Sequence, residues 1–208
     1  MKKTKIKVCG ITRAEDAIRV FELGGWAIGF VFWPGSPRYI KPKKAGLIVR
    51  SLEEKGMSFS HVVGVFVNPA SDEIREALQF SGIDTVQLHG DEDPGFCNGL
   101  EIPYIKAFRL RQKEDTAMFG GYGSARYFLV DASVQGSYGG TGRVCDWNIA
   151  REAAGCGKLI LSGGLGPSNI KEAVSVVQPF AVDLSSGVEE RAGVKSHTLL
   201  EELFNAVE

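Results

Sequence analysis

Leu161-Ser-Gly-Gly-Leu-Gly-Pro-Ser168 is a glycine-rich segment that follows an apolar, strand-like run, and Val182-Asp-Leu-Ser-Ser-Gly-Val188 repeats the arrangement shortly after it. Each segment precedes a helical pattern. Glycine lets backbone N–H groups approach an anion closely, and the start of a helix adds the positive end of its dipole. Two such turns after consecutive strands are typical of the phosphate site of a (β/α)8 barrel. The two segments therefore predict a barrel that binds a phosphorylated small molecule.

Strand-like and helix-like patterns alternate along the rest of the chain. The strand-like runs are short and apolar, as parallel strands buried on both faces are. We expect them at Ile6–Cys9, Ala27–Phe32, His61–Val67, Thr85–His89, Tyr104–Ala107, Tyr127–Asp131, Lys158–Leu161 and Ala181–Leu184. Because no linker divides the chain, we predict one α/β domain over residues 1–208, a (β/α)8 TIM barrel. The alternative is an open, doubly wound sheet, although Cys9-Gly-Ile-Thr12 lacks the glycine fingerprint typical of that fold.

Several connecting helices are indicated by caps and apolar stripes. Thr12-Arg-Ala-Glu15 fits a capping box, and Gly24-Gly25 would end the helix that it begins. Pro167 suits the first turn of the helix that follows it. The weakest helical patterns are those of Asp93–Leu100 and Gln112–Gly120.

The composition argues against several classes of protein. Hydrophobic residues make up 44% of the chain, enough for a substantial core, and 24 basic against 25 acidic residues leave a net charge of −1. Because no block of like charge stands out, we expect neither a nucleic-acid partner nor a membrane partner. The N-terminus lacks the apolar stretch of a signal peptide, and the four cysteines include no CxxC pair. We therefore expect a cytoplasmic protein with reduced thiols and no metal.

Reactive side chains recur where the expected strands end, which is the end of a barrel that carries its chemistry. Cys9 ends the first strand near a helix start, a setting that favours a thiolate able to act as nucleophile or general base. Read alone, Cys9 is a small buried apolar residue. Asp131 ends the sixth strand, where a carboxylate either caps the next turn or transfers a proton. Across a barrel mouth, the two would form a proton-transfer pair.

Other strand-end residues have both a functional and a structural interpretation. The fork of Arg38 would suit a carboxylate held at two points, although an exposed arginine is usually only solvated. His89 would either contact substrate or make structural hydrogen bonds, and Asp183 would contact substrate or cap the turn after it. The stretch Gln135–Gly142 is either a linker or a loop that folds over bound ligand, the interpretation that we favour.

These residues together resemble the phosphoribosylanthranilate isomerases of tryptophan biosynthesis. The resemblance runs through Lys7-Val-Cys-Gly-Ile-Thr12, Ser36-Pro-Arg38, Gly64-Val-Phe-Val-Asn68, Val86-Gln-Leu-His-Gly-Asp91, Val130-Asp131, Gly139-Gly-Thr-Gly142, Leu161-Ser-Gly-Gly-Leu165 and Val182-Asp-Leu-Ser-Ser-Gly-Val-Glu189. Their order and their positions at successive strand ends make the combined signal specific. One departure is Ser196, where the family usually has aspartate; either residue caps a helix well.

The resemblance implies an Amadori rearrangement of N-(5-phosphoribosyl)anthranilate to 1-(2-carboxyphenylamino)-1-deoxyribulose 5-phosphate, with no cofactor. In that family the aspartate matching Asp131 is the general acid that protonates the ribose ring oxygen. The cysteine matching Cys9 is the general base that removes the C2′ proton. Substrate contacts are expected from Arg38, near the anthranilate carboxylate, from His89 and Asp183, and from the phosphate-binding residues Gly163, Gly164, Ser185, Ser186 and Gly187.

Three rival functions are weighed against this one. A related isomerase of histidine biosynthesis has aspartate where Cys9 stands and a substrate with two phosphates, whereas one phosphate site is indicated here; secondary activity on that substrate stays open. A barrel that only binds a phosphosugar would need neither Cys9 nor Asp131. A ribulose-phosphate epimerase would need clustered metal ligands, and the three histidines are dispersed. We expect a monomer, with a dimer as the alternative.

Overall fold

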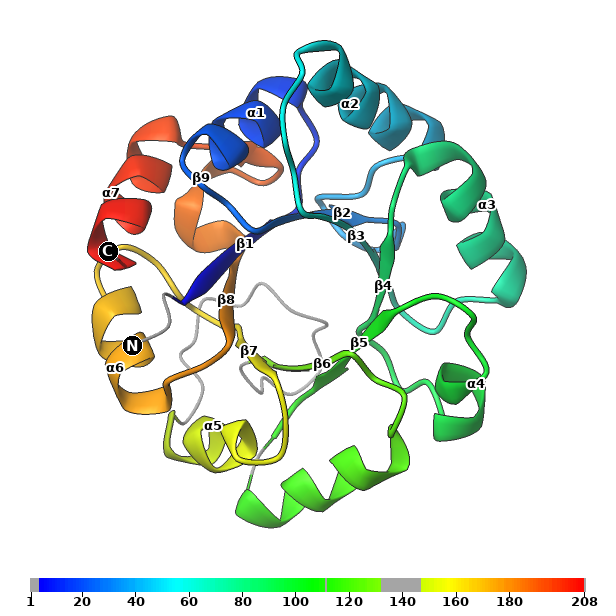
Figure 1. Cartoon of the computed structure of the whole chain (residues 1–208), viewed down its shortest axis with the longest axis vertical. Coiled ribbons are helices and arrows are strands. Elements are labelled where there is room, and N and C mark those ends of the chain that lie inside the picture. Colours follow the sequence, from blue (N-terminus) through cyan, green and yellow to red (C-terminus); the bar gives the residue numbers. More distant parts are fainter. Residues whose placement is uncertain (1–3, 111, 132–146, 208) are drawn as a thin grey trace.

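The computed structural model describes residues 4–110, 112–131 and 147–207, and its central feature is a closed barrel of eight parallel strands (Figure 1). The strands are β1 (Lys5–Cys9), β2 (Ala27–Val31), β3 (His61–Phe66), β4 (Thr85–Leu88), β5 (Tyr104–Phe108), β6 (Tyr127–Val130), β7 (Leu159–Leu161) and β8 (Ala181–Leu184). β1 closes the ring against β8, with Lys7 opposite Asp183. This closure confirms the predicted (β/α)8 barrel and excludes the open sheet.

Helices form a ring around the barrel (Figure 1). They are α1 (Ala14–Glu22), α2 (Pro42–Glu54), α3 (Ser71–Ser81), α4 (Pro94–Asn98), the 3-10 helix η1 (Lys113–Gly121), α5 (Trp147–Ala154), α6 (Ile170–Val177) and α7 (His197–Val207). A single 3-10 turn, η2 (Ser186–Val188), and a hairpin of β9 (Glu189–Arg191) and β10 (Val194–Lys195) separate β8 from α7. Within the described ranges, every helix is too short or too polar to cross a membrane.

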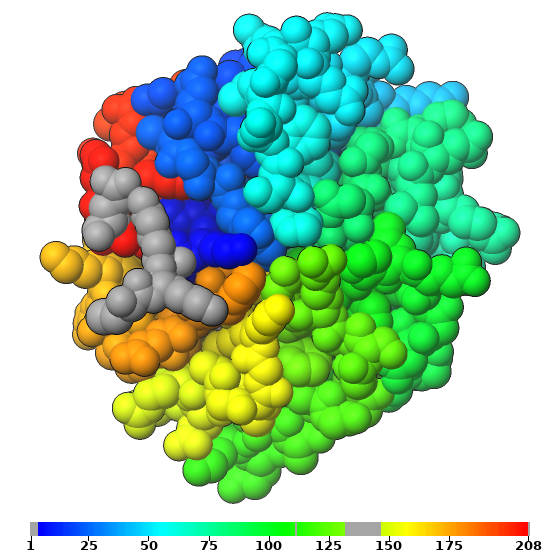
Figure 2. Space-filling view, in the orientation of Figure 1, coloured from blue at the N-terminus to red at the C-terminus, as the bar shows by residue number. Residues whose placement is uncertain are grey.

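The core has two parts, because successive side chains of a strand face opposite sides of the sheet. The outward side chains pack against the helices in one large apolar cluster. The inward side chains fill the barrel, and atoms occupy the ring of the ribbon drawing in the space-filling view (Figure 2). Trp26, Tyr127 and Phe180 close the amino end, with ring centroids 5.1 to 5.5 Å apart. The carboxyl end of the barrel is therefore the end that can receive a ligand.

The helix boundaries correct several predictions. α1 begins at Ala14 with Arg13 as its N-cap and no side-chain cap, because the Thr12 hydroxyl donates to the carbonyl of Gly193 instead. The capping box at Thr12 is therefore wrong. Pro167 lies before α6, whose N-cap is Asn169, and not in its first turn.

The two weakest helical patterns give the two least regular helices. The first forms only the short α4, capped by a 3.1 Å hydrogen bond from the Phe96 N–H to Asp93. The second forms the 3-10 helix η1. At the start of α7, the Oγ of Ser196 accepts from the N–H of Leu199 at 3.4 Å. Ser196 therefore does act as a cap where the family usually has aspartate.

Candidate active site

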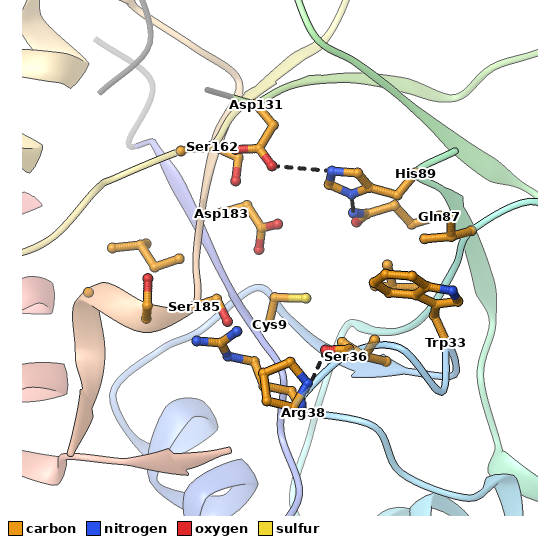
Figure 3. A pocket seen from close by; sticks show the side chains of 18 of the residues that line it. Cys9, Trp33, Ser36, Arg38, Gln87, His89, Asp131, Ser162, Asp183 and Ser185 are labelled. Carbon is orange, nitrogen blue, oxygen red and sulfur yellow. Dashed lines mark hydrogen bonds and ion pairs between the residues drawn. The ribbon is translucent and has the colours of Figure 1, made fainter. Parts of the chain in front are cut away.

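A cavity of about 330 Å³ lies at the carboxyl end of the barrel (Figure 3). It is lined by all ten site residues predicted from the sequence: Cys9, Arg38, His89, Asp131, Gly163, Gly164, Asp183, Ser185, Ser186 and Gly187. They come from loops and strand ends far apart in the chain. The barrel brings them together because all eight strands are parallel and end at the same rim.

Cys9 ends β1 on the same face as Lys7, inside the barrel. The Nζ of Lys7 lies 2.9 Å from Oδ1 of Asp183, and both side chains are buried. Burial alone would lower the pKa of Lys7, but the adjacent Asp183 carboxylate more than offsets this and raises it. An ammonium is therefore kept inside the barrel beside Cys9.

The environment of Cys9 opposes a thiolate more than the sequence indicated. Burial raises the pKa of the Cys9 thiol, and the Lys7 ammonium opposes this rise without cancelling it. We expected the nearby helix start to favour a thiolate, but the net effect of the surroundings is to raise the pKa of Cys9, so this expectation is wrong. Burial therefore favours the thiol form of Cys9, and base chemistry requires that this thiol first lose its proton.

Asp131 belongs to a chain of hydrogen bonds along one wall of the cavity (Figure 3). Its Oδ2 lies 3.2 Å from Nε2 of His89, and Nδ1 of the same ring lies 2.9 Å from Nε2 of Gln87. His89 thus makes structural hydrogen bonds and also lines the cavity, a position that is compatible with both interpretations. Gln87 was not singled out from the sequence.

Arg38 reaches the cavity from the segment between β2 and α2, and it is held there by Glu189 of β9. Its Nε lies 2.9 Å from Oε1, and its Nη2 lies 2.7 Å from Oε2. These hydrogen bonds raise the pKa of Arg38 against the effect of burial. The edge of the guanidinium formed by Nε and Nη2 is therefore already occupied by Glu189, which leaves Nη1 for a ligand.

Lys195 connects Glu189 to the general-base candidate. Its buried Nζ donates to Oε1 of Glu189 at 2.8 Å, to the carbonyl of Cys9 at 2.6 Å and to that of Ser185 at 3.1 Å. The hairpin that separates β8 from α7 is thereby fastened to the carboxyl ends of β1 and β8. The sequence did not indicate these contacts.

The glycine-rich turns after β7 and β8 line one part of the cavity, and Figure 3 labels Ser162 and Ser185 of these turns. We call Gly163, Gly164, Ser185, Ser186 and Gly187 the cradle. Gly163 and Gly164 adopt φ of 96° and 65°, values that favour glycine. A Cβ on Gly187 would collide with the carbonyl of Leu165. The first glycine-rich segment is followed by α6, as the sequence indicated. The second is followed by the single turn η2 and the hairpin, and not directly by a helix. The geometry suits a phosphate bound by backbone N–H groups.

An apolar wall lies on the other side of the cavity. Val31, Val65 and Trp33 pack together beside Cys9, and Figure 3 shows the indole across the cavity from Ser185. This wall was not predicted as part of the site. Trp33 directly follows the second expected strand, Ala27–Phe32, and this position could have marked it as a site residue. The two sides of the cavity would suit a ligand that carries a phosphate at one end and an apolar ring at the other.

Two expectations about the site concern metals and the stretch Gln135–Gly142. Among the described residues, no group of three His, Cys, Asp or Glu side chains is placed to hold a metal ion. Cys9, Cys97 and Cys156 are free of disulfides. The predicted ligand-covering stretch Gln135–Gly142 lies outside the described residues.

A closed barrel whose cavity is lined by glycine-rich turns after β7 and β8 is typical of the class of phosphate-binding (β/α)8 barrels. Comparison with known proteins identifies the family. The sequence model described as "PRAI: N-(5'phosphoribosyl)anthranilate (PRA) isomerase" matches residues 6–206. The N-(5'-phosphoribosyl)anthranilate isomerase of Citrifermentans bemidjiense is 46% identical over 192 residues, which cover 92% of this chain and 91% of that protein.

Comparison with solved structures points to the same family. The phosphoribosyl anthranilate isomerase of Thermotoga maritima has a TM-score of 0.88 and 36% identity, with 98% of both chains covered. A phosphoribosyl anthranilate isomerase in complex with reduced 1-(o-carboxyphenylamino)-1-deoxyribulose 5-phosphate has a TM-score of 0.85 and 35% identity over 98% of both chains. The chain therefore belongs to the N-(5'-phosphoribosyl)anthranilate isomerase family and is an enzyme of that family.

Proposed function

We propose that this enzyme converts N-(5-phosphoribosyl)anthranilate to 1-(2-carboxyphenylamino)-1-deoxyribulose 5-phosphate in tryptophan biosynthesis. The observation that carries the proposal is the position of Cys9 and Asp131 in one cavity, between a glycine cradle and an apolar wall. Such a cavity offers an acid, a base, a phosphate site and a ring site. Family membership and the relative that binds the reduced product support the same reaction.

The proposed chemistry uses the two reactive side chains in turn. Asp131 gives a proton to the ribose ring oxygen as the bond from C1′ to that oxygen breaks, and the nitrogen lone pair forms the C1′=N bond. Cys9, as thiolate, then removes the C2′ proton, which yields an enolamine. Loss of the enol proton and protonation of C1′ complete the ketose. General acid and base catalysis of this kind is worth about 10²- to 10⁴-fold for each group.

The rest of the cavity binds the two ends of the substrate in this proposal. The phosphate lies on the backbone of the cradle (Gly163, Gly164, Ser185, Ser186 and Gly187). The anthranilate ring lies against Trp33, and its carboxylate meets the Nη1 side of Arg38. Asp183 and His89 line the cavity and contact the substrate, with Lys7 and Asp131 as their respective partners.

The test is the loss of phosphoribosylanthranilate fluorescence when protein is added to substrate generated in place from anthranilate. We expect enzyme-dependent decay well above the spontaneous rate. Cys9→Ala and Asp131→Asn should each lower kcat by about 10²-fold or more, with affinity for phosphate ligands changed by no more than a few fold. The control is Cys156→Ala, which removes another free cysteine, one that is exposed, and should retain full activity.

Other results would redirect the assignment. No decay with folded wild-type protein would favour the histidine-pathway substrate or a barrel that only binds phosphosugars. Turnover of Cys9→Ala comparable to that of the wild type would remove Cys9 from the mechanism.

We also propose that residues 1–208 form one domain of a cytoplasmic monomer, with a dimer as the alternative.

A further inference from the structure

Gln87 is a buried polar side chain to which the proposed mechanism gives no role. It is 1% exposed on β4, with its Nε2 2.9 Å from Nδ1 of His89. Its Oε1 has no hydrogen-bond partner among the described residues. A buried carbonyl oxygen without a partner is costly, so the contact that the amide makes with His89 calls for a functional reason.

The direction of that contact determines which nitrogen of His89 carries the proton. An amide NH₂ group only donates, so Nδ1 must accept and has to be unprotonated. The ring is then neutral, and its single proton lies on Nε2. The opposite amide orientation would turn Oε1 towards Nδ1 and select the other tautomer.

The tautomer in turn determines where the acid proton of Asp131 lies. The Nε2–H of His89 donates to Oδ2 of Asp131 across 3.2 Å. A neutral carboxyl group carries its proton on one oxygen, and the oxygen that accepts from an N–H keeps its lone pairs for that purpose. The proton is then left on Oδ1. With the other tautomer, Nε2 would accept the proton of Oδ2 and withhold it from a substrate.

We propose that Gln87 is a positioning residue for the general acid: its amide fixes His89 as the Nε2–H tautomer and so keeps the acid proton of Asp131 on Oδ1. The catalytic part of this inference rests on the proposed role of Asp131. The tautomer of His89 does not depend on that role and is measured separately.

Imidazole nitrogen NMR reads the tautomer directly, and His61→Gln and His197→Gln variants assign the His89 signals among the three histidines. In the wild type we expect neutral His89 with its proton on Nε2. Gln87→Met should give a mixture of tautomers, and Gln87→Glu, which only accepts at neutral pH, should move the proton to Nδ1. A wild-type proton on Nδ1, or the same tautomer in all three proteins, would overturn the proposal.

Kinetics then separate a positioning role from a packing role. Met fills nearly the same volume as Gln and carries no charge and no amide, so a packing role predicts that Gln87→Met keeps activity. We expect instead that both variants lose roughly 10-fold or more in kcat, with KM changed less than about two-fold. Gln79→Met on the exposed face of α3 is the matched control, and thermal unfolding verifies folding.

Wild-type kcat in either Gln87 variant would contradict the proposal. An inactive wild type whose His89 shows the expected tautomers would instead refute the proposed function and leave the Gln87–His89 relationship standing.

Discussion

Arg38 and Glu189 lie 151 residues apart in the chain, and the barrel joins them in a two-pronged ion pair with N–O distances of 2.9 and 2.7 Å. Hydrogen bonds from Arg38 offset the effect of burial on Glu189 and hold its pKa below the usual range. The carboxylate also accepts from Lys195. The position of Arg38 in the cavity is therefore set by the hairpin between β8 and α7.

Removal of Arg38 should weaken substrate binding more than turnover. Loss of a charge-assisted hydrogen bond costs about 1.5–3 kcal/mol, so Arg38→Ala should raise KM by roughly 10- to 100-fold. Glu189→Gln should raise KM in the same direction by less, since Arg38 stays but is held less firmly. Steady-state kinetics measure both, with Arg50→Ala on the exposed face of α2 as the control. An unchanged KM and rate in Arg38→Ala would refute the carboxylate contact.

Cys9 should titrate at a higher pH than an ordinary thiol. Because burial raises its pKa, the thiolate fraction at any given pH is smaller than that of a thiol with the usual pKa of about 8.5. Only the thiolate is alkylated, so labelling by iodoacetamide should increase through a midpoint above that value. Peptide mass spectrometry across pH gives the midpoint, with exposed Cys156 as the internal reference. A Cys9 midpoint at or below about 8.5 contradicts this prediction.

Gly164→Ala should impair phosphate binding without abolishing the fold. Gly164 has φ of 65°, where a side chain costs about 1–2 kcal/mol, and the backbone would relax away from the cradle shape. We expect a higher KM and weaker inhibition by inorganic phosphate. Gly120→Ala is the control, because a Cβ there would meet open space. If the KM and the phosphate inhibition of both variants equal those of the wild type, the phosphate does not lie on this cradle.

The buried pair of Lys106 and Glu92 should matter for stability far more than an exposed pair. Lys106 Nζ lies 2.8 Å from Glu92 Oε2, and each side chain is 3% exposed. Lys106→Met leaves a buried carboxylate unpaired and should cost about 3–5 kcal/mol in the free energy of unfolding.

The matched exposed pair is Lys113 with Glu152, 3.1 Å apart. Lys113→Met should change stability by no more than about 1 kcal/mol. Urea unfolding of both variants measures the difference. Equal, small losses would show that Glu92 does not depend on Lys106, and that its hydrogen bonds from the backbone of Asn68 and Gly90 suffice.

The sequence by itself determined the number and order of the eight barrel strands and the residues at their ends, but not the hairpin of β9 and β10. Short apolar runs are local patterns, and parallel strands in a closed barrel must all end at one rim. That is why Cys9 and Asp131 were predicted to share a cavity without knowledge of any distance, and both line it.

Only the tertiary structure decided what those residues touch. Thr12 fits a capping box in the sequence, but its hydroxyl finds Gly193 at the far end of the chain. Lys7 forms an ion pair with Asp183 because the barrel closes between β1 and β8. Arg38 forms one with Glu189 because the hairpin after β8 lies beside it. The net rise of the Cys9 pKa follows from burial, which no local pattern measures. The strand pattern is a property of neighbouring residues, whereas pairing, burial and proton affinity depend on the closed barrel.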